Sequence, residues 1–112
     1  MDKLIERGLL FDFYGDLLTD HQQKIYSEAV FNDLSLTELS EEEGISRQGI
    51  HDLIKRCDKM LIDYENKLHL IKRFQNIKSK VTDLDKRIDL CDLDEGLKKS
   101  LKSDLNSIIE EL

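Results

Sequence analysis

The sequence predicts an all-α fold in which a helix-turn-helix is followed by long C-terminal helices. The 112 residues include no proline, which favours uninterrupted helices over a turn-rich β fold. Apolar residues recur at spacings of three and four along most of the chain, whereas strand-like alternation is hard to find. Two capped segments also flank Gly44, as in two helices joined by a tight turn. We expect a helix-turn-helix domain over residues 1–61 and a helical extension over residues 62–112.

Two helices are predicted before the central motif. The first spans residues 2–18, although two glycines weaken it. Its apolar spacing places four side chains on one face, namely Leu10, Phe13, Tyr14 and Leu17. The second helix follows a capping box of Thr19 and Gln22 and is expected to end near Asn32. Its buried face is expected to contain Ile25, Tyr26, Ala29 and Val30.

The stretch LSLTELSEEEGISRQGIHDLIKR carries the clearest helix signals. Ser35 and Glu38 make a capping box, which predicts a short helix over about residues 36–43. Gly44 follows, where a left-handed backbone costs glycine nothing. Ser46 then caps a new helix, so that two capped helices are separated by a glycine turn. Two pairs are expected to form hydrophobic staples, Leu34 with Leu39 and Ile45 with Ile50.

Long helices are predicted after the turn. We expect one helix over residues 46–88, or two nearly collinear helices that break near residues 79–82. At 1.5 Å per residue, the continuous helix would be about 60 Å long. A final helix is expected to start near Asp92, capped by Asp92 with Glu95. Its apolar positions are Leu97, Leu101, Leu105, Ile108 and Leu112.

The chain is acidic, with 24 acidic and 17 basic residues and a formal net charge of -7 at pH 7. The basic residues nevertheless concentrate in one region. Residues 46–61 carry four basic and two acidic residues, and residues 62–82 carry five basic and two acidic residues. In a nucleic-acid-binding protein this basic region is where phosphates would be contacted. The rest of the chain would repel nucleic acid and keep non-specific affinity low. Charge alone would favour an ordinary solvated helix face over nucleic-acid binding.

The sequence shows no signal for a membrane span, a signal peptide, a metal site or a phosphate-binding loop. No run approaches the roughly 18 apolar residues of a membrane span. The N-terminal stretch MDKLIERGLLFDFYGDLL lacks the features of a signal peptide, so we expect a cytoplasmic location. Cys57 and Cys91 occupy apolar helical positions and are both expected to be reduced core residues. None of the three histidines is part of a set of cysteines, histidines or carboxylates at the spacing that builds a zinc site on one helix face, and no glycine-rich phosphate cradle is present, so we expect neither an enzyme nor a cofactor.

Residues 18–55 resemble the fourth region of bacterial sigma factors. The matching positions are Ser35-Leu36, Glu38-Leu39, Gly44-Ile45-Ser46-Arg47 and Lys55-Arg56. FDFYGDLLT near the N-terminus and SRQGI after the turn narrow the match to the YlxM family, which the chain resembles over its whole length. The resemblance implies an all-helical protein of the winged-helix-type DNA-binding superfamily, without a wing. It also implies a regulatory role linked to the signal recognition particle pathway, with the particle's GTPase or RNA as a partner.

The expected reading surface is the start of the second motif helix, because this part of a helix-turn-helix enters the major groove. Ile50 and Leu53 should face the core. Arg47 could reach guanine and Gln48 could reach adenine, while the serine hydroxyl and the other basic side chains would hold phosphates. Asp52 is unfavourable for DNA binding on this surface, because its carboxylate would face a phosphate or need a cytosine amino group as its partner. The candidate nucleic-acid-binding residues are Ser46, Arg47, Gln48, His51, Lys55 and Arg56.

Three residues depart from the usual helix-turn-helix pattern. Ser40 stands where alanine is preferred, although it is small enough to keep the helices close. Glu43 stands where an apolar residue is usual, so the core is expected to be thin there. Gly49 replaces a better helix former and would cost up to about 1 kcal/mol relative to alanine if it were solvent exposed. These departures keep a second interpretation open, an adaptor that binds signal recognition particle components without reading a DNA sequence.

A homodimer is expected to form through the C-terminal helices. The helix-turn-helix core is too small to cover a helix of the predicted length, and the final helix is shorter than the apolar stripe beside it. A two-fold partner would bury the remainder with the same surface on both chains. The alternative is a compact monomer in which the long helix breaks near Ser79. The expected interface residues are Tyr64, Leu68, Ile71, Phe74, Ile77, Val81, Leu84 and Ile88.

Overall fold

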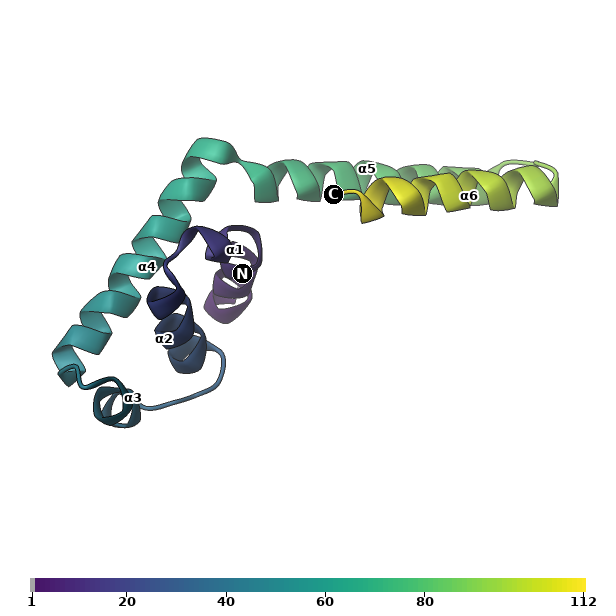
Figure 1. The fold of residues 1–112 in the computed structure, drawn as a ribbon. Helices are drawn as coiled ribbons and strands as arrows, with labels where there is room; N and C mark the ends of the chain where they lie inside the picture. The colour runs from purple at the N-terminus through teal and green to yellow at the C-terminus, as the bar shows by residue number, and fades with distance from the viewer. Residues whose placement is uncertain (1) are drawn as a thin grey trace. The chain divides into compact units, whose positions relative to one another are not determined.

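The computed structural model describes residues 2–112, and within that range it contains helices but no strands (Figure 1). Six α-helices and one short 3₁₀ helix follow one another there, so the predicted all-α fold is confirmed. The helices group into two compact units. The first unit ends at His69, and the second comprises Leu70–Leu112. The boundary predicted between residues 61 and 62 lies inside a continuous helix, Arg47–Leu68.

The first unit begins with α1 (Lys3–Tyr14), which passes into the 3₁₀ helix η1 (Gly15–Leu17). The helical segment predicted over residues 2–18 is present over residues 3–17, but its last three residues form a 3₁₀ helix. A 3₁₀ helix has about 3.0 residues per turn instead of about 3.6, so side chains beyond α1 rotate away from their α-helical positions. As a result Leu17, which the spacing placed on one face with Leu10 and Tyr14, is 54% exposed, whereas Leu18 is 4% exposed.

α2 (Asp20–Val30) starts at the predicted capping box. Thr19 Oγ1 accepts the backbone N–H of Gln22 at 3.1 Å, and Gln22 Oε1 accepts the backbone N–H of Thr19 at 3.0 Å. Ile25 and Tyr26 are both 0% exposed, which confirms the centre of the predicted buried face. The other two predicted core positions of α2 are only partly buried, and the helix ends slightly before its predicted limit.

The helix-turn-helix consists of α3 (Leu36–Glu43) and α4 (Arg47–Leu68). Its core joins both helices to α2. Ile25, Leu39 and Ile50 form the centre of this core, and each is 0% exposed. Partly buried apolar side chains pack around them, namely Ala29, Leu34, Leu36, Ile45, Leu53 and Ile54. All four residues of the predicted hydrophobic staples belong to this cluster, so local spacing in the sequence correctly predicted part of this core.

The long helix predicted over residues 46–88 ends early, at Leu68. His69 has φ 56° and ψ 30°, a left-handed conformation, and its N–H donates to the Glu65 carbonyl oxygen at 2.9 Å. The chain continues as α5 (Leu70–Leu90), which passes unbroken through the break predicted at residues 79–82. Histidine is among the few non-glycine residues enriched in the left-handed region, so a single such residue ends the helix without a glycine or proline signal.

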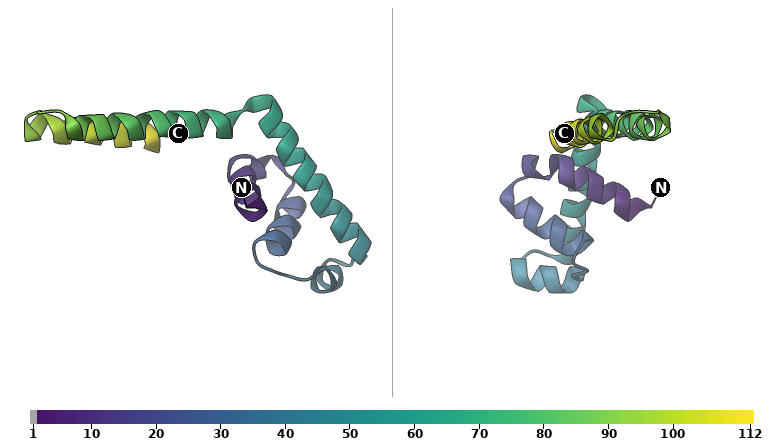
Figure 2. Two further views of the ribbon diagram at one scale, coloured as in Figure 1. Left: turned by 180° about the vertical axis from the view of Figure 1, so that it is seen from behind. Right: turned by 90° about the vertical axis from the view of Figure 1, so that its right-hand side faces the viewer.

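The second unit is a hairpin of α5 and α6 (Glu95–Glu110), which lie side by side in all views of Figures 1 and 2. Lys102 Nζ lies 2.6 Å from Asp89 Oδ1 and 3.7 Å from Asp85 Oδ1, so one ammonium group links α6 to two successive turns of α5. Asp94 caps α6 by accepting the Leu97 N–H at 3.3 Å. The predicted cap at Asp92 is wrong, because the chain turns through residues 91–94 before α6 begins.

The two cysteines differ in their surroundings. Cys57 is buried at 0% exposure on α4, as expected, and its thiol is free. Cys91 is also free but exposed, so its assignment to the core is wrong. α5 stops at Leu90, and the helical spacing that placed Cys91 on an apolar face no longer applies in the loop. Among residues 2–112, none of the helices combines the length and the apolar character that crossing a membrane requires.

Candidate nucleic-acid interface

The turn that presents α4 is held by the predicted capping residues. Ser35 and Ser46 each accept the backbone N–H of the third following residue, at 3.1 and 3.0 Å, and so cap α3 and α4. Gly44 has φ 66°, the left-handed conformation for which glycine was singled out in the sequence. These three observations confirm the local design of the helix-turn-helix.

Two of the three residues that depart from the usual pattern, Ser40 and Gly49, make close contacts with Ile45. Ser40 Oγ donates to the Ile45 carbonyl oxygen at 2.5 Å, so its hydroxyl fastens the end of α3 to the segment entering α4. Gly49 lies against Ile45, because a Cβ atom built on Gly49 would stand 2.7 Å from Ile45 Cγ2. An alanine would have to displace a side chain that packs on the central core. The helix-propensity cost was expected for a solvent-exposed glycine, and Gly49 is only partly exposed, so that condition is not met.

All six predicted nucleic-acid-binding residues are exposed along the start of α4. Ile50, between them in sequence, is 0% exposed and faces the core. The helix thus separates a polar outer surface from an apolar inner one within its first turns. Within residues 2–112, no ion pair engages Arg47, Lys55 or Arg56, so these three cations are available to an external anion. We call the six residues the α4 outer face: Ser46, Arg47, Gln48, His51, Lys55 and Arg56.

Asp52 interrupts the positive charge of the α4 outer face and makes specific contacts there. Gln48 Nε2 donates to Asp52 Oδ1 at 2.8 Å, one helical turn away. His51 Nδ1 lies 3.9 Å from the same oxygen. Asp52, identified in the sequence as unfavourable for DNA binding, therefore holds the side-chain amide of Gln48, a predicted base-reading residue.

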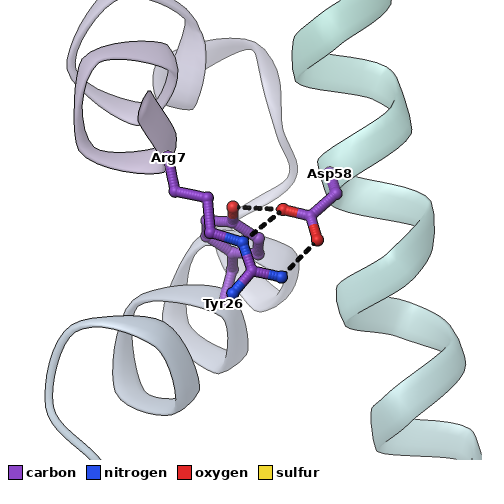
Figure 3. Close-up of polar contacts among 3 residues, drawn as sticks. All are labelled: Arg7, Tyr26 and Asp58. Carbon is purple, nitrogen blue, oxygen red and sulfur yellow. Dashed lines mark hydrogen bonds and ion pairs between the residues drawn. The ribbon is translucent and has the colours of Figure 1, made fainter. Parts of the chain in front are cut away.

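A polar cluster that the sequence did not reveal ties α4 to α1 and α2 (Figure 3). Asp58 of α4 accepts from Arg7 of α1 through Nε to Oδ1 at 3.1 Å and through Nη2 to Oδ2 at 2.5 Å. Tyr26 of α2 donates its phenolic O–H to Asp58 Oδ1 at 2.5 Å. The Arg7 and Asp58 side chains are 25% and 23% exposed, so the ion pair is partly shielded from water. We call these three residues the Asp58 clamp.

Burial raises the pKa of the Tyr26 phenol well above its ordinary value, and the hydrogen bond to Asp58 raises it further. The phenol therefore remains a hydrogen-bond donor at neutral pH. The Arg7 pKa is raised chiefly by its hydrogen bond to Asp58. Both shifts favour the protonation states that donate to the carboxylate. The clamp thus fixes the middle of α4, at Asp58, to α1 and α2.

Glu43, expected to thin the core at the end of α3, instead pairs with α2. Its Oε1 lies 3.1 Å from Lys24 Nζ, and its Oε2 lies 3.2 Å from His21 Nε2. The hydrogen bond from Lys24 is the main cause of a lowered pKa for the Glu43 carboxyl. The ionised carboxylate therefore takes the place of an apolar contact between α2 and α3.

The same region gathers three carboxylates. Glu28, Glu42 and Glu43 place one oxygen each within 4.8 Å of one another. Their spacing in sequence resembles no metal motif, which is why the group was not anticipated. Lys24 already compensates the charge of Glu43.

Family comparison agrees with this architecture. The family model described as "Putative helix-turn-helix protein, YlxM / p13 like" matches residues 1–102. A UPF0122 protein of Clostridium novyi (strain NT) is 42% identical over 114 residues, covering 98% of each chain. Another from Thermoanaerobacter sp. (strain X514) is 45% identical over 89 residues, covering 80% of this chain and 76% of the relative. One from Halalkalibacterium halodurans is 36% identical over 112 residues, covering 100% of this chain and 95% of its own. The chain therefore belongs to the UPF0122 family of YlxM/p13-like helix-turn-helix proteins.

Proposed function

We propose that the protein is a non-enzymatic, cytoplasmic regulator that binds double-stranded DNA through the α4 outer face. One observation carries the proposal: three exposed cations without an ion-pair partner in residues 2–112 line a capped helix whose opposite face is buried in the core. In a helix-turn-helix, the first turns of the second helix enter the major groove. The buried face fixes the helix, and the outer face is left for the nucleic acid.

The residues of the α4 outer face would contact different parts of the DNA. Arg47 stands in the first turn of α4, where its planar guanidinium can bond guanine O6 and N7. Lys55 and Arg56 lie two turns further on and would contact phosphates. The Ser46 hydroxyl oxygen accepts within the cap, and its proton remains available to a phosphate. Acidic residues elsewhere keep non-specific binding weak, so base contacts must supply much of the affinity.

Replacing Arg47 and Lys55 together by glutamate tests this function. We expect the Arg47→Glu, Lys55→Glu variant to lose about a hundredfold or more in DNA affinity, because a base contact and a phosphate contact both become repulsive. Fluorescence anisotropy with a selected duplex measures the change, and parent binding should fall steeply with salt. A Lys86→Glu, Lys99→Glu variant changes the charge equally on exposed positions of α5 and α6 and should bind as the parent does. Equal binding by both variants would remove the α4 outer face from the function.

We further propose that two chains associate through their α5–α6 hairpins. Two packed helices cover each other on one side only, and the second unit leaves Leu84, Leu97 and Ile108 45%, 49% and 47% exposed. A second hairpin would complete a four-helix bundle with a common apolar core. Tyr64, one of the predicted interface residues, already packs within the first unit, with its ring centroid 6.0 Å from that of Tyr14. The proposed interface therefore centres on Ile77, Val81, Leu84 and Ile88.

Light scattering at micromolar concentration measures the proposed association. We expect twice the mass of a single chain for the parent, and a single-chain mass for Leu84→Asp with Leu97→Asp, because two charges would enter the apolar core of the bundle. Leu4→Asp with Leu17→Asp is the matched control, since both leucines are more than half exposed in the first unit. It should remain a dimer. A parent with single-chain mass contradicts the proposal directly.

A second candidate function is an adaptor for the signal recognition particle, bound through its GTPase or RNA. The acidic side chains exposed on α2 and α3, together with Asp52 on α4, favour it, because they suit a basic protein surface better than DNA. Recovery of partners from lysate with and without nuclease separates the two candidates. Particle components that survive nuclease and are retained by Arg47→Glu, Lys55→Glu would favour the adaptor.

A further inference from the structure

Gln48 and Asp52 form a hydrogen-bonded pair at the centre of the α4 outer face. They stand one turn apart on α4, both are exposed, and the donor Nε2 lies 2.8 Å from the acceptor Oδ1. Neither side chain is needed to hold the fold, because α4 is capped by Ser46 and anchored by Ile50. The pair therefore lies where a groove-reading contact is wanted, and its bond orders one side chain that would otherwise rotate freely.

The bond leaves Gln48 with the groups that adenine requires. A glutamine amide has two N–H donors and one carbonyl acceptor. Asp52 takes one N–H, and the second N–H and the carbonyl oxygen remain. Bidentate recognition of adenine in the major groove uses one donor for N7 and one acceptor for the N6 amino group. Fixing the amide before contact lowers the side-chain ordering that binding requires.

The charge of Asp52 acts in the opposite direction on affinity. Its Oδ2 has no hydrogen bond or ion pair within residues 2–112, and His51 approaches only Oδ1. A carboxylate among Arg47, Lys55 and Arg56 opposes approach to phosphates. One residue thus lowers the affinity for any nucleic acid while ordering the side chain that reads a base.

We propose that Asp52 is a specificity-determining residue that positions the Gln48 amide to read adenine in the major groove of duplex DNA. This inference rests on the proposed DNA-binding function. Duplex RNA is disfavoured as the ligand, because its major groove is too deep and narrow for side chains to read. The Asp52 oxygen that accepts the hydrogen bond positions the Gln48 amide. The negative charge of Asp52 only lowers the affinity for nucleic acid.

Asp52→Asn and Asp52→Ala separate the acceptor from the charge. Asparagine keeps a carbonyl acceptor at the same distance along the side chain and removes the charge, whereas alanine removes both. Duplexes selected from a random pool should show one position at which the parent prefers adenine by about tenfold or more. Asp52→Asn should bind more tightly and keep that preference. Asp52→Ala should also bind more tightly but fall to the preference of Gln48→Ala.

NMR of the free protein gives a second measurement that needs no DNA. The Gln48 side-chain amide protons should shift and exchange faster in Asp52→Ala than in the parent, and Asp52→Asn should resemble the parent. Retention of the adenine preference by Asp52→Ala, or its loss in Asp52→Asn, would overturn the inference while leaving DNA binding in place. Failure of the parent and all three variants to bind any duplex would overturn the proposed function together with the inference.

Discussion

Asp58→Ala is expected to lower the free energy of unfolding of the first unit by about 3 kcal/mol, because a partly buried charge pair loses one member. The substitution leaves the Arg7 guanidinium without the two oxygens that it now contacts, and it leaves the Tyr26 phenol without its acceptor. α4 would then lose its side-chain hydrogen bond to Tyr26 of α2 and its ion pair with Arg7 of α1. The apolar core and the hydrogen bond from the Tyr14 O–H to Glu65 Oε1 would still join α4 to α1.

Tyrosine fluorescence during urea unfolding measures this loss selectively. The chain has three tyrosines and no tryptophan, and Tyr14, Tyr26 and Tyr64 all belong to the first unit. Tyr26→Phe removes one hydrogen bond and should cost only about 1 kcal/mol. Asp52→Ala is the matched control, since it removes an exposed aspartate from the same helix and should change stability by less than about 0.5 kcal/mol. Equal stabilities for Asp58→Ala and Asp52→Ala would show that the clamp contributes nothing.

The elements that were predicted correctly depend on signals within a few residues. Thr19, Ser35 and Ser46 bond to N–H groups three positions ahead, and Gly44 needs only its own freedom at positive φ. The exposure of the α4 outer face follows from the same local information, since Ile50 fixes which side of the helix is buried. The starts of α2, α3 and α4 and the exposed side of α4 were therefore accessible from spacing and capping.

The Asp58 clamp was missed because its partners are distant in sequence. Arg7 and Asp58 are 51 positions apart, and Tyr26 and Asp58 are 32 apart, so no local pattern connects them. Gly49 was interpreted by helix propensity, which contains no information about the Ile45 methyl group that closes on it. The break at His69 likewise involves one left-handed residue inside an uninterrupted apolar pattern. Propensity and periodicity describe a helix by itself, whereas the Asp58 clamp arises when helices pack.

Leu18→Ala is expected to destabilise the first unit by about 3 kcal/mol, the usual size for a buried leucine truncated to alanine. Its neighbour Leu17 should tolerate the same change with a loss below about 0.5 kcal/mol, because its side chain already stands largely in water. The two leucines are 4% and 54% exposed, and they differ by one position in the chain. Periodicity counted through a continuous helix predicts the reverse order.

This pair tests the 3₁₀ helix η1 directly. The Leu18 N–H donates to the Gly15 carbonyl oxygen at 3.0 Å, a bond across three residues that tightens the chain after α1. Both variants remove the same atoms from the same type of side chain, so the composition changes equally. Urea unfolding followed by tyrosine fluorescence gives the two free energies. A larger loss for Leu17→Ala than for Leu18→Ala would mean that α1 continues as an α-helix in solution and that Leu17 faces the core.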